Sequence, residues 1–339
     1  MDGTLGADVS QRASGMRVLI TGGAGFLGRR LARALVARGV LTGTSGREEK
    51  VDQITLFDIV APDGLESQML SGVAGDVADR DALAALIDAD TTSIFHLAAV
   101  VSGGAEADFD LGMRVNFDAT RQLLEVCRQR GHRPRIVFTS SVAVFGGDLP
   151  DLVQETTALT PQSSYGAEKA MAELLVADYT RKGFVDGRAL RLPTVSVRPG
   201  RPNAALSSFA SSIIREPLNG ETAVCPVDRD ARVWILSPDR AVECLIRGHE
   251  LAPEVLGISR SVNLPGLSVT VGEMVAALER LAGPDVARLI RWEPDSRVQR
   301  VVASWPGAFE TSRAEALGFR GDADIESVIR AHMATQAKT

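Results

Sequence analysis

The sequence predicts an α/β fold, in which a doubly wound parallel sheet with helices on both faces is followed by a smaller mixed α/β lobe. Three observations favour this fold. Apolar runs of strand length alternate with stretches of helical periodicity through residues 16–196, as in parallel sheets covered on both faces. A glycine-rich turn joins the first apolar run to the first helical stretch. After Arg198 the elements shorten and prolines become frequent, which indicates a second lobe.

The expected elements follow in chain order. Each expected strand is a short apolar run between small or polar residues, whereas each expected helix repeats apolar residues at intervals of three and four. Strands are expected at 17–20, at 53–59, just before Gly75, and at 93–97, 135–140 and 187–195. Helices are expected at 25–39, which Gly39 would stop, and at 79–88, 110–130 and 163–182. In the second half, helical periodicity recurs at 204–215, 239–251, 271–281 and 325–333.

Composition excludes several classes of protein. Apolar residues make up 45% of the 339 residues, enough for a sizeable core, and a net charge of −6 without a basic stripe argues against a nucleic-acid partner. No apolar run approaches the ~18 residues of a membrane span, so we expect no membrane partner. The three cysteines and four histidines show neither a disulfide framework nor metal-ligand spacing, so no metal is expected. The polar leader 1–15 lacks the order of a signal peptide, which makes the cytoplasm the expected location.

The glycine-rich turn at 21–28 predicts a Rossmann-type dinucleotide site. The chain would turn sharply at Gly22, let a pyrophosphate approach the backbone at Gly25, and pack helix against strand at Gly28. The helix that follows offers unpaired N–H groups to the phosphates. Phe26 and Leu27 lie in the same turn and are expected beside the cofactor.

Asp58, at the end of the second expected strand, indicates which dinucleotide binds. Its carboxylate would accept hydrogen bonds from the ribose hydroxyls and would repel a 2′-phosphate. The next residues, Ile59 and Val60, bring no cation to bind such a phosphate, so the pattern favours NAD over NADP. The segment 41–50 is interpreted as an insertion that lengthens the usual spacing between the glycines and this aspartate.

Two further strand ends contribute expected cofactor contacts. Asp76, with Val77 beside it, is placed either to meet the adenine amino group or to cap the next helix, and the sequence supports both interpretations equally. Leu97, Ala98 and Ala99 follow the fourth strand, where small side chains would let the backbone pass close to the cofactor.

Tyr165 and Lys169 form the expected catalytic pair, one helical turn apart on one face of a helix. A free phenol has a pKa of about 10, and the nearby ammonium and the nicotinamide ring are expected to lower it. The phenol would then take a proton from a substrate hydroxyl while hydride leaves the same carbon. At the end of the fifth strand, Ser140 and Ser141 face opposite sides, so one of them is expected to hold the substrate oxygen. The family resemblance described below favours Ser141. His96 is interpreted as a packed strand-end histidine.

These features together resemble the extended short-chain dehydrogenases/reductases, the group that contains NAD-dependent sugar epimerases and dehydratases. The resemblance covers about residues 16–333 and is carried by the glycine turn at 21–28, His-Leu-Ala-Ala at 96–99, Asn116, Ser140-Ser141 before 144–146, Tyr165 with Lys169, and Arg191. It implies that Ser141 is catalytic and that Asn116, Pro193 and Val195 lie beside NAD. It also implies a homodimer.

A narrower resemblance, to the D-erythronate dehydrogenases, is carried by the segments 197–203 and 208–220. Those enzymes oxidise the C2 hydroxyl of a four-carbon sugar acid with NAD. The aromatic–Asn pair usual in epimerases after Leu-Arg is replaced here by 192–195. A small acid calls for guanidinium and amide donors. The residues expected at the substrate are therefore Ser102, Ser141, Tyr165, Thr194, Arg201, Asn203 and Arg232.

Alternatives remain for three of these residues. Arg201 would also fit as a surface charge, Arg232 as the partner of an internal carboxylate, and Asn203 as a helix cap. At the level of function, the favoured hypothesis is an NAD-dependent dehydrogenase of a sugar acid. A nucleotide-sugar epimerase or dehydratase would use the same site, and a non-catalytic NAD-sensing regulator is a third hypothesis.

The expected domain organisation follows from these assignments. Residues 1–15 form a flexible leader, 16–196 the NAD-binding domain, and 197–339 mainly the substrate-binding lobe, with about 231–265 returning to the first domain. Because no long Gly/Ser-rich or charged linker separates the halves, the lobe is expected to pack over the open end of the sheet.

Overall fold

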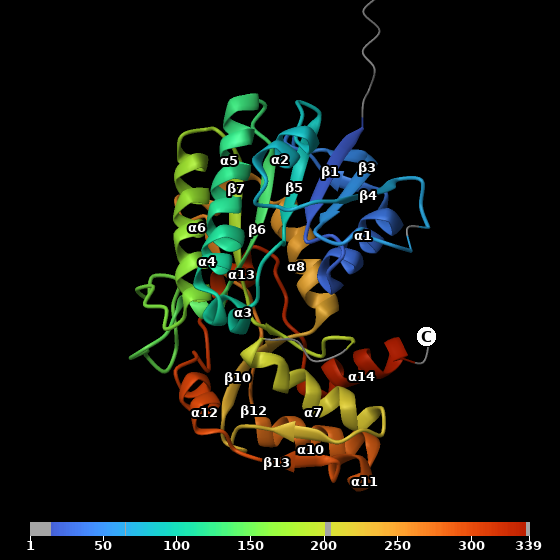
Figure 1. Ribbon diagram of the computed structural model, residues 1–339, viewed down its shortest axis with the longest axis vertical. Coiled ribbons are helices and arrows are strands. Elements are labelled where there is room, and N and C mark those ends of the chain that lie inside the picture. Colours follow the sequence, from blue (N-terminus) through green and yellow to red (C-terminus); the bar gives the residue numbers. More distant parts are fainter. Residues whose placement is uncertain (1–14, 65, 201–204, 337–339) are drawn as a thin grey trace, which may run out of the picture.

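The large sheet forms the frame of the molecule. The computed structural model describes residues 15–64, 66–200 and 205–336, and Figure 1 shows their arrangement. The sheet has the order β11-β7-β6-β5-β1-β3-β2, with β4 also paired to β3, and every pair is parallel except β2 with β3. Its strands are β1 (Met16–Thr21), β2 (Val40–Thr42), β3 (Glu48–Asp58), β4 (Leu70–Ala74), β5 (Thr91–His96), β6 (Arg135–Ser141), β7 (Asp186–Leu192) and β11 (Ser261–Asn263).

Helices cover both faces of this sheet, which confirms the doubly wound α/β fold. On one face α1 and α8 bury residues such as Leu31, Leu35 and Leu245 against the strands. On the other face α2, α5 and α6 bury residues such as Leu83 and Leu123. The bounds are α1 (Phe26–Arg38), α2 (Arg80–Leu86), α5 (Ala119–Arg130), α6 (Ser164–Arg181) and α8 (Pro238–Glu250). Helix α1 ends as expected, because Gly39 adopts a left-handed φ of 69° and donates its N–H to Leu35 O.

The expected long helix at 110–130 is interrupted. Two short helices, α3 (Ser102–Ala107) and α4 (Phe109–Gly112), precede a π-helical stretch, η1 (Met113–Asp118). The α-helix resumes with α5 after that stretch. Apolar periodicity does not reveal such a stretch, since it adds a single residue to a turn without changing which face is buried.

Two other expected boundaries differ in the structure. The insertion at 41–50 forms a hairpin, in which β2 pairs antiparallel with the start of β3, so β3 begins earlier than expected. The single strand expected at 187–195 is divided at Pro193. Its first part, β7, stays in the large sheet, and β8 (Thr194–Val195) joins the small lobe. Proline has no N–H to continue a ladder, which explains the break.

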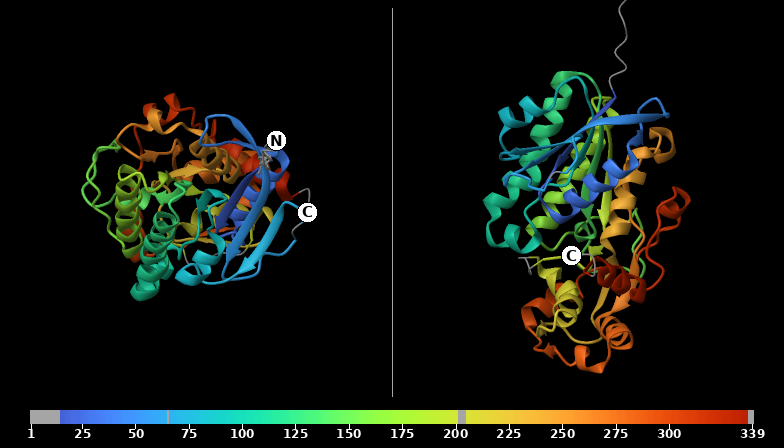
Figure 2. Two further views of the ribbon diagram at one scale, coloured as in Figure 1. Left: turned by 90° about the horizontal axis from the view of Figure 1, so that it is seen from above. Right: turned by 90° about the vertical axis from the view of Figure 1, so that its right-hand side faces the viewer.

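The small lobe has a core of its own at one end of the large sheet (Figure 2). Its strands are β9 (Ala223–Cys225), β10 (Arg232–Leu236), β12 (Leu267–Thr270) and β13 (Ile290–Trp292); β12-β10-β8 form one sheet and β13-β9 another. Its helical segments are η3 (Leu206–Ser208), α7 (Phe209–Leu218), α10 (Val271–Ala282), α11 (Pro284–Ala287), α12 (Ser296–Ala303) and α14 (Ile325–Gln336). Two short helices, α9 (Pro253–Leu256) and α13 (Ser312–Ala316), pack on the core of the large sheet. Of the segment 231–265, α8 and β11 pack on the large sheet, whereas β10 belongs to the small lobe.

Most apolar residues of the two long helices are used inside the molecule. Leu123, Leu124 and Val176 are fully buried in the core, whereas Leu174 on α6 is 67% exposed. The three cysteines are free and buried. Across the described residues, no helix combines the length and apolar character needed to cross a membrane.

Candidate active site

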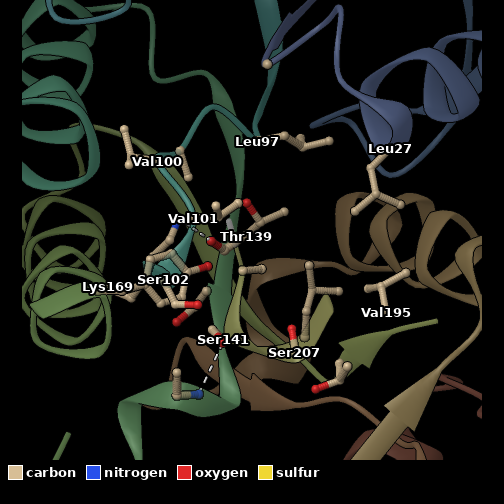
Figure 3. Close-up of a pocket in the computed structure, with 18 of the residues that line it drawn as sticks. Leu27, Leu97, Val100, Val101, Ser102, Thr139, Ser141, Lys169, Val195 and Ser207 are labelled. Carbon is tan, nitrogen blue, oxygen red and sulfur yellow. Dashed lines mark hydrogen bonds between the residues drawn. The ribbon is translucent and has the colours of Figure 1, made fainter. Parts of the chain in front are cut away.

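A pocket of about 530 Å³ lies where the carboxyl ends of the strands meet the small lobe. Figure 3 shows side chains from several strand ends and from the lobe converging on it. The residues expected at the cofactor or substrate that line it are Gly22, Gly25, Phe26, Leu27, Gly28, Asp58, Asp76, Val77, Leu97, Ala98, Ala99, Ser102, Ser141, Tyr165, Lys169, Pro193, Thr194 and Val195.

The glycine turn has the shape that a pyrophosphate requires. Gly22 has a φ of +71°, a conformation that favours glycine. A Cβ at Gly28 would lie 2.3 Å from Gly22 O, so only glycine lets the helix approach the turn. Gly25 is the N-cap residue of helix α1 and offers no side chain to cap it. The first N–H groups of the helix are therefore available toward the pocket. These residues therefore fit a dinucleotide.

Asp58 is fixed at the rim of the pocket by two backbone amides. Its Oδ2 accepts a hydrogen bond from Ala24 N at 2.9 Å, and its Oδ1 accepts one from Ile59 N at 2.7 Å. The side chain of Ile59 also lines the pocket and is 69% exposed. The carboxylate and the apolar surface beside it suit a ribose and its base.

Asp76 does not cap the next helix. Asp79 caps α2, accepting from the N–H groups of Asp81 and Ala82, so the capping interpretation of Asp76 is wrong. Asp76 accepts a hydrogen bond from Ala78 N at 2.9 Å and pairs with Arg114, and both Asp76 and Arg114 line the pocket. Burial opposes its ionisation, but the hydrogen bonds from Arg114 and Ala78 and the charge of Arg114 hold the pKa of Asp76 below its ordinary value.

The expected catalytic pair meets at the pocket. Helix α6 begins just before Tyr165, capped by Ser163 Oγ, which accepts from Gly166 N at 3.1 Å. Lys169 donates from Nζ to Thr139 O at 2.9 Å and lies 5.7 Å from the centroid of the Tyr165 ring. Burial lowers the pKa of Lys169 to about 8.

The pKa of the phenol lies above its ordinary value. Burial raises the pKa of Tyr165 to about 12, and only in part is this opposed by the charge of Arg198 and by a hydrogen bond with Ser141. Removing the phenolate from water outweighs the charge of Arg198. The expected lowering depends also on the positive nicotinamide ring, so it stays a prediction.

The two serines at the end of β6 have different roles. Ser140 is buried and donates from Oγ to Glu173 Oε1 at 2.5 Å, inside a network in which Glu173 also pairs with Arg191. Ser141 lines the pocket, accepts from Ala143 N at 3.1 Å, and lies within hydrogen-bonding reach of Tyr165. The geometry therefore assigns the pocket position to Ser141.

His96 is part of the protein interior. Its Nδ1 lies 2.7 Å from Thr21 Oγ1 and its Nε2 lies 3.0 Å from Thr120 Oγ1. Burial, together with the charge of Lys169, lowers the pKa of His96 to about 3, so the ring is neutral near pH 7. In the described parts of the chain, no three His, Cys, Asp or Glu side chains are grouped to hold a metal ion.

Two expected residues that the structure describes, Asn116 and Arg232, do not line the pocket. Asn116 is buried on η1, where its amide contacts the backbone of Val100 and the carboxylate of Glu168. Arg232 is exposed at the start of β10, donates to Ser268 Oγ at 3.2 Å, and does not line the pocket. Arg201 and Asn203 lie outside the described residues.

Sequence reasoning missed several residues from the small lobe. Arg198, Ser207, Trp234 and Trp305 all line the pocket. Arg198 stands in the same segment as Arg201, so the sequence identified the segment but not the residue. Trp234 and Trp305 carry no local signal, because their approach to the pocket depends on how the lobe docks.

Comparisons with known proteins agree with this geometry. Residues 18–246 match the model of the NAD dependent epimerase/dehydratase family. The chain is 59% identical over 318 residues to a D-erythronate dehydrogenase of Cupriavidus necator, covering 94% of this chain and 98% of that protein. It is 45% identical over 316 residues to a D-erythronate dehydrogenase of Haemophilus influenzae, covering 93% and 98%. A solved structure described as a nucleoside-diphosphate-sugar epimerase from Agrobacterium tumefaciens has a TM-score of 0.89 at 43% identity, covering 96% of this chain and 95% of that one.

Proposed function

The chain belongs to the NAD dependent epimerase/dehydratase family, within the extended short-chain dehydrogenases, and is an oxidoreductase that acts on CH–OH groups; from this premise we propose that it oxidises the C2 hydroxyl of a small sugar acid, D-erythronate, with NAD. The observation that carries the proposal is the convergence of Tyr165, Ser141 and Lys169 in one pocket, beside a glycine turn shaped for a dinucleotide. The choice of D-erythronate as substrate rests on the similarity to the two D-erythronate dehydrogenases.

The residues of this chain divide the work of binding. The turn at Gly22, Gly25 and Gly28 would hold the pyrophosphate, Asp58 the adenine-side ribose and Asp76 the adenine amino group. A fixed carboxylate at Asp58 favours NAD, because it would repel the additional phosphate of NADP. Bound NAD supplies the acceptor for a hydride.

The chemistry at the substrate would fall to three side chains. Ser141 holds the C2 oxygen against Tyr165, and Tyr165 accepts the hydroxyl proton as the C2–H bond breaks with its electron pair and a carbonyl forms at C2. Lys169, fixed on Thr139 O, presents its ammonium near the phenol and would also hold the nicotinamide ribose. The product is a 2-oxo acid.

A second candidate function is nucleotide-sugar epimerisation, which the likeness to the Agrobacterium tumefaciens structure favours. An epimerase of this family returns the hydride to its substrate and produces no net NADH. A purely regulatory NAD-binding role has less support, because Tyr165 and Lys169 are both present and both line the pocket.

One assay separates these functions. Purified protein is mixed with NAD and D-erythronate, and the absorbance of NADH is followed, with NADP and L-threonate in parallel arms. We expect NADH from NAD and D-erythronate and a much slower reaction with NADP. Turnover of a UDP-sugar, with no NADH from any sugar acid, would establish the epimerase instead.

A further inference from the structure

Arg198 carries a positive charge into the pocket at the point where the small lobe meets the large sheet. Two bonds orient its guanidinium: Nε donates to Val195 O at 3.0 Å and Nη2 donates to Ser207 Oγ at 3.1 Å. Its backbone is held as well, since Arg198 N donates to Ser211 Oγ and Arg198 O accepts from Arg215. The cation is therefore positioned in advance of any ligand.

This guanidinium is partly buried, and it differs from the four fully buried arginines in having no carboxylate partner among the described residues. Arg135, Arg188, Arg191 and Arg215 each pair with a buried or nearly buried carboxylate at 2.6–3.1 Å. Within the described residues no Asp or Glu forms an ion pair with Arg198, and its Nη1 makes no hydrogen bond there. Residues 201–204 contain no acidic side chain that would supply one. Because a desolvated charge without a partner is costly, such a cation in a pocket indicates a site for an anion.

The position of this site relative to the base fixes which anion it suits. Arg198 lies close enough to Tyr165 for its charge to act on the phenol, and Ser141, at the end of β6, hydrogen-bonds the same phenol. In the view of Figure 3, Ser207 and Val195, the two groups that hold Arg198, lie on one side of Ser141, and Lys169 lies on the other. In a 2-hydroxy acid the carboxylate is attached directly to the carbon that reacts. An anion site beside the base therefore matches that class of substrate.

We propose that Arg198 is a specificity-determining residue that binds the C1 carboxylate of a 2-hydroxy acid and so brings the C2 hydroxyl to Tyr165 and Ser141. This inference rests on the proposed function and names the residue that selects its substrate class. The guanidinium uses Nη1 for the carboxylate, while Nε and Nη2 keep it aligned. Neutral polyols and amides lack the charge that this site requires.

The test compares Arg198→Met and Arg198→Lys with wild type and with a control, Arg291→Met, which removes an exposed arginine from β13 in the same lobe. Each protein is assayed with D-erythronate and with its neutral C1 amide, and NADH affinity is measured by fluorescence. We expect Arg198→Met to lose about 100-fold or more in kcat/KM for the acid, mainly through KM, and to lose most of its preference for acid over amide. Arg198→Lys should recover part of both, and NADH affinity should be unchanged.

Each outcome has a definite meaning. An Arg198→Met or Arg198→Lys protein that binds NADH and keeps the wild-type preference for acid over amide overturns the inference and leaves the proposed function intact. If Arg198→Met fails to bind NADH, the inference is judged from Arg198→Lys alone. That variant keeps the positive charge but lacks the paired N–H donors of the guanidinium. A wild-type protein that oxidises no sugar acid refutes the proposed function itself, and the assignment to Arg198 falls with it.

Discussion

At the scale of single residues, the two tyrosines of the chain provide a matched test of the catalytic base, because both lie on α6. Tyr165→Phe removes the phenol oxygen at the pocket, and we expect kcat/KM to fall by roughly 10²- to 10⁴-fold, the usual contribution of a positioned proton acceptor. The affinity for NADH should be retained, because the ring remains in place. Steady-state kinetics and NADH fluorescence measure the two effects.

Tyr179→Phe is the control for that variant. It removes an identical oxygen, which donates to Glu125 Oε2 at 3.2 Å near the other end of the same helix. We expect normal kcat/KM and a loss of about 1 kcal/mol in the free energy of unfolding. Equal kinetic losses in the two variants would show that the helix, and not the phenol at 165, accounts for the effect.

The residues that sequence reasoning found share one property. Gly22, Asp58, Ser141 and Tyr165 are tied to an element end, where spacing along the chain fixes their position. Arg198 was not singled out, because it becomes distinctive only when the four buried arginines are each seen to have a carboxylate partner. Pairing is a property of the folded molecule and leaves no trace in local spacing.

At the scale of elements, the π-helical stretch η1 carries Asn116, which lies behind the pocket wall and contacts Val100. Asn116 Oδ1 accepts from Val100 N at 2.8 Å, while Nδ2 donates to Val100 O at 3.0 Å and to Glu168 Oε2 at 2.6 Å. Val100 lines the pocket, whereas Asn116 does not. The side chain therefore acts as a positioning residue, holding the loop after β5 against the helix that bears Tyr165.

Asn116→Leu tests this role. Because the substitution leaves the part-buried backbone groups of Val100 and the buried carboxylate of Glu168 without this partner, we expect a loss of at least about 2 kcal/mol in the free energy of unfolding. Displacement of Val100 should also raise the KM for NAD more than it lowers kcat. Asn219→Leu, at the exposed end of α7, is the control. A less stable Asn116→Leu protein with unchanged KM for NAD would reduce the role of Asn116 to packing.

The elements also show where prediction from sequence stops. Strands β1, β5 and β6 and helices α1, α6 and α8 were found within a few residues, because alternating apolar runs and end signals specify them locally. The β2–β3 hairpin and the π-helical stretch were not. In both segments the apolar pattern is also compatible with a simpler structure. The hairpin is recognised only by the pairing of β2 with β3, and the π-helical stretch only in the fold, where its Asn116 bonds to Val100.

At the scale of the whole molecule, the site exists because two lobes with separate cores meet at the carboxyl ends of the strands. The large domain contributes Ser141 from β6 and Tyr165 from α6, and the lobe contributes Ser207, Trp234 and Trp305. The order of the elements predicts that the lobe packs there, but its docking is decided by many weak contacts distributed along the chain. For this reason the pocket residues at the strand ends were accessible from sequence, whereas Arg198, Ser207, Trp234 and Trp305 were not.

Two histidines buried in the large domain link the stability of the whole fold to pH. His96 is enclosed between Thr21 and Thr120, and burial with the charge of Lys169 lowers its pKa to about 3. His249 is stacked on Phe95, and burial with the charges of nearby arginines holds its pKa well below the ordinary value.

The sign of the effect follows from which state binds protons. Below pH 6.5 an unfolded chain protonates both histidines whereas the folded protein does not, so the free energy of unfolding must decrease as the pH falls. Each histidine contributes about 1.4 kcal/mol per pH unit once its unfolded form is fully protonated. Urea unfolding without added NAD, at steps from pH 7 to pH 5, measures this dependence. His332, whose pKa burial also lowers, adds to it, and Glu168, whose pKa burial raises, opposes it. We expect His96→Gln to have a shallower slope than the wild type, and equal stability of the wild type at pH 5 and pH 7 would contradict the assignment of both rings as neutral.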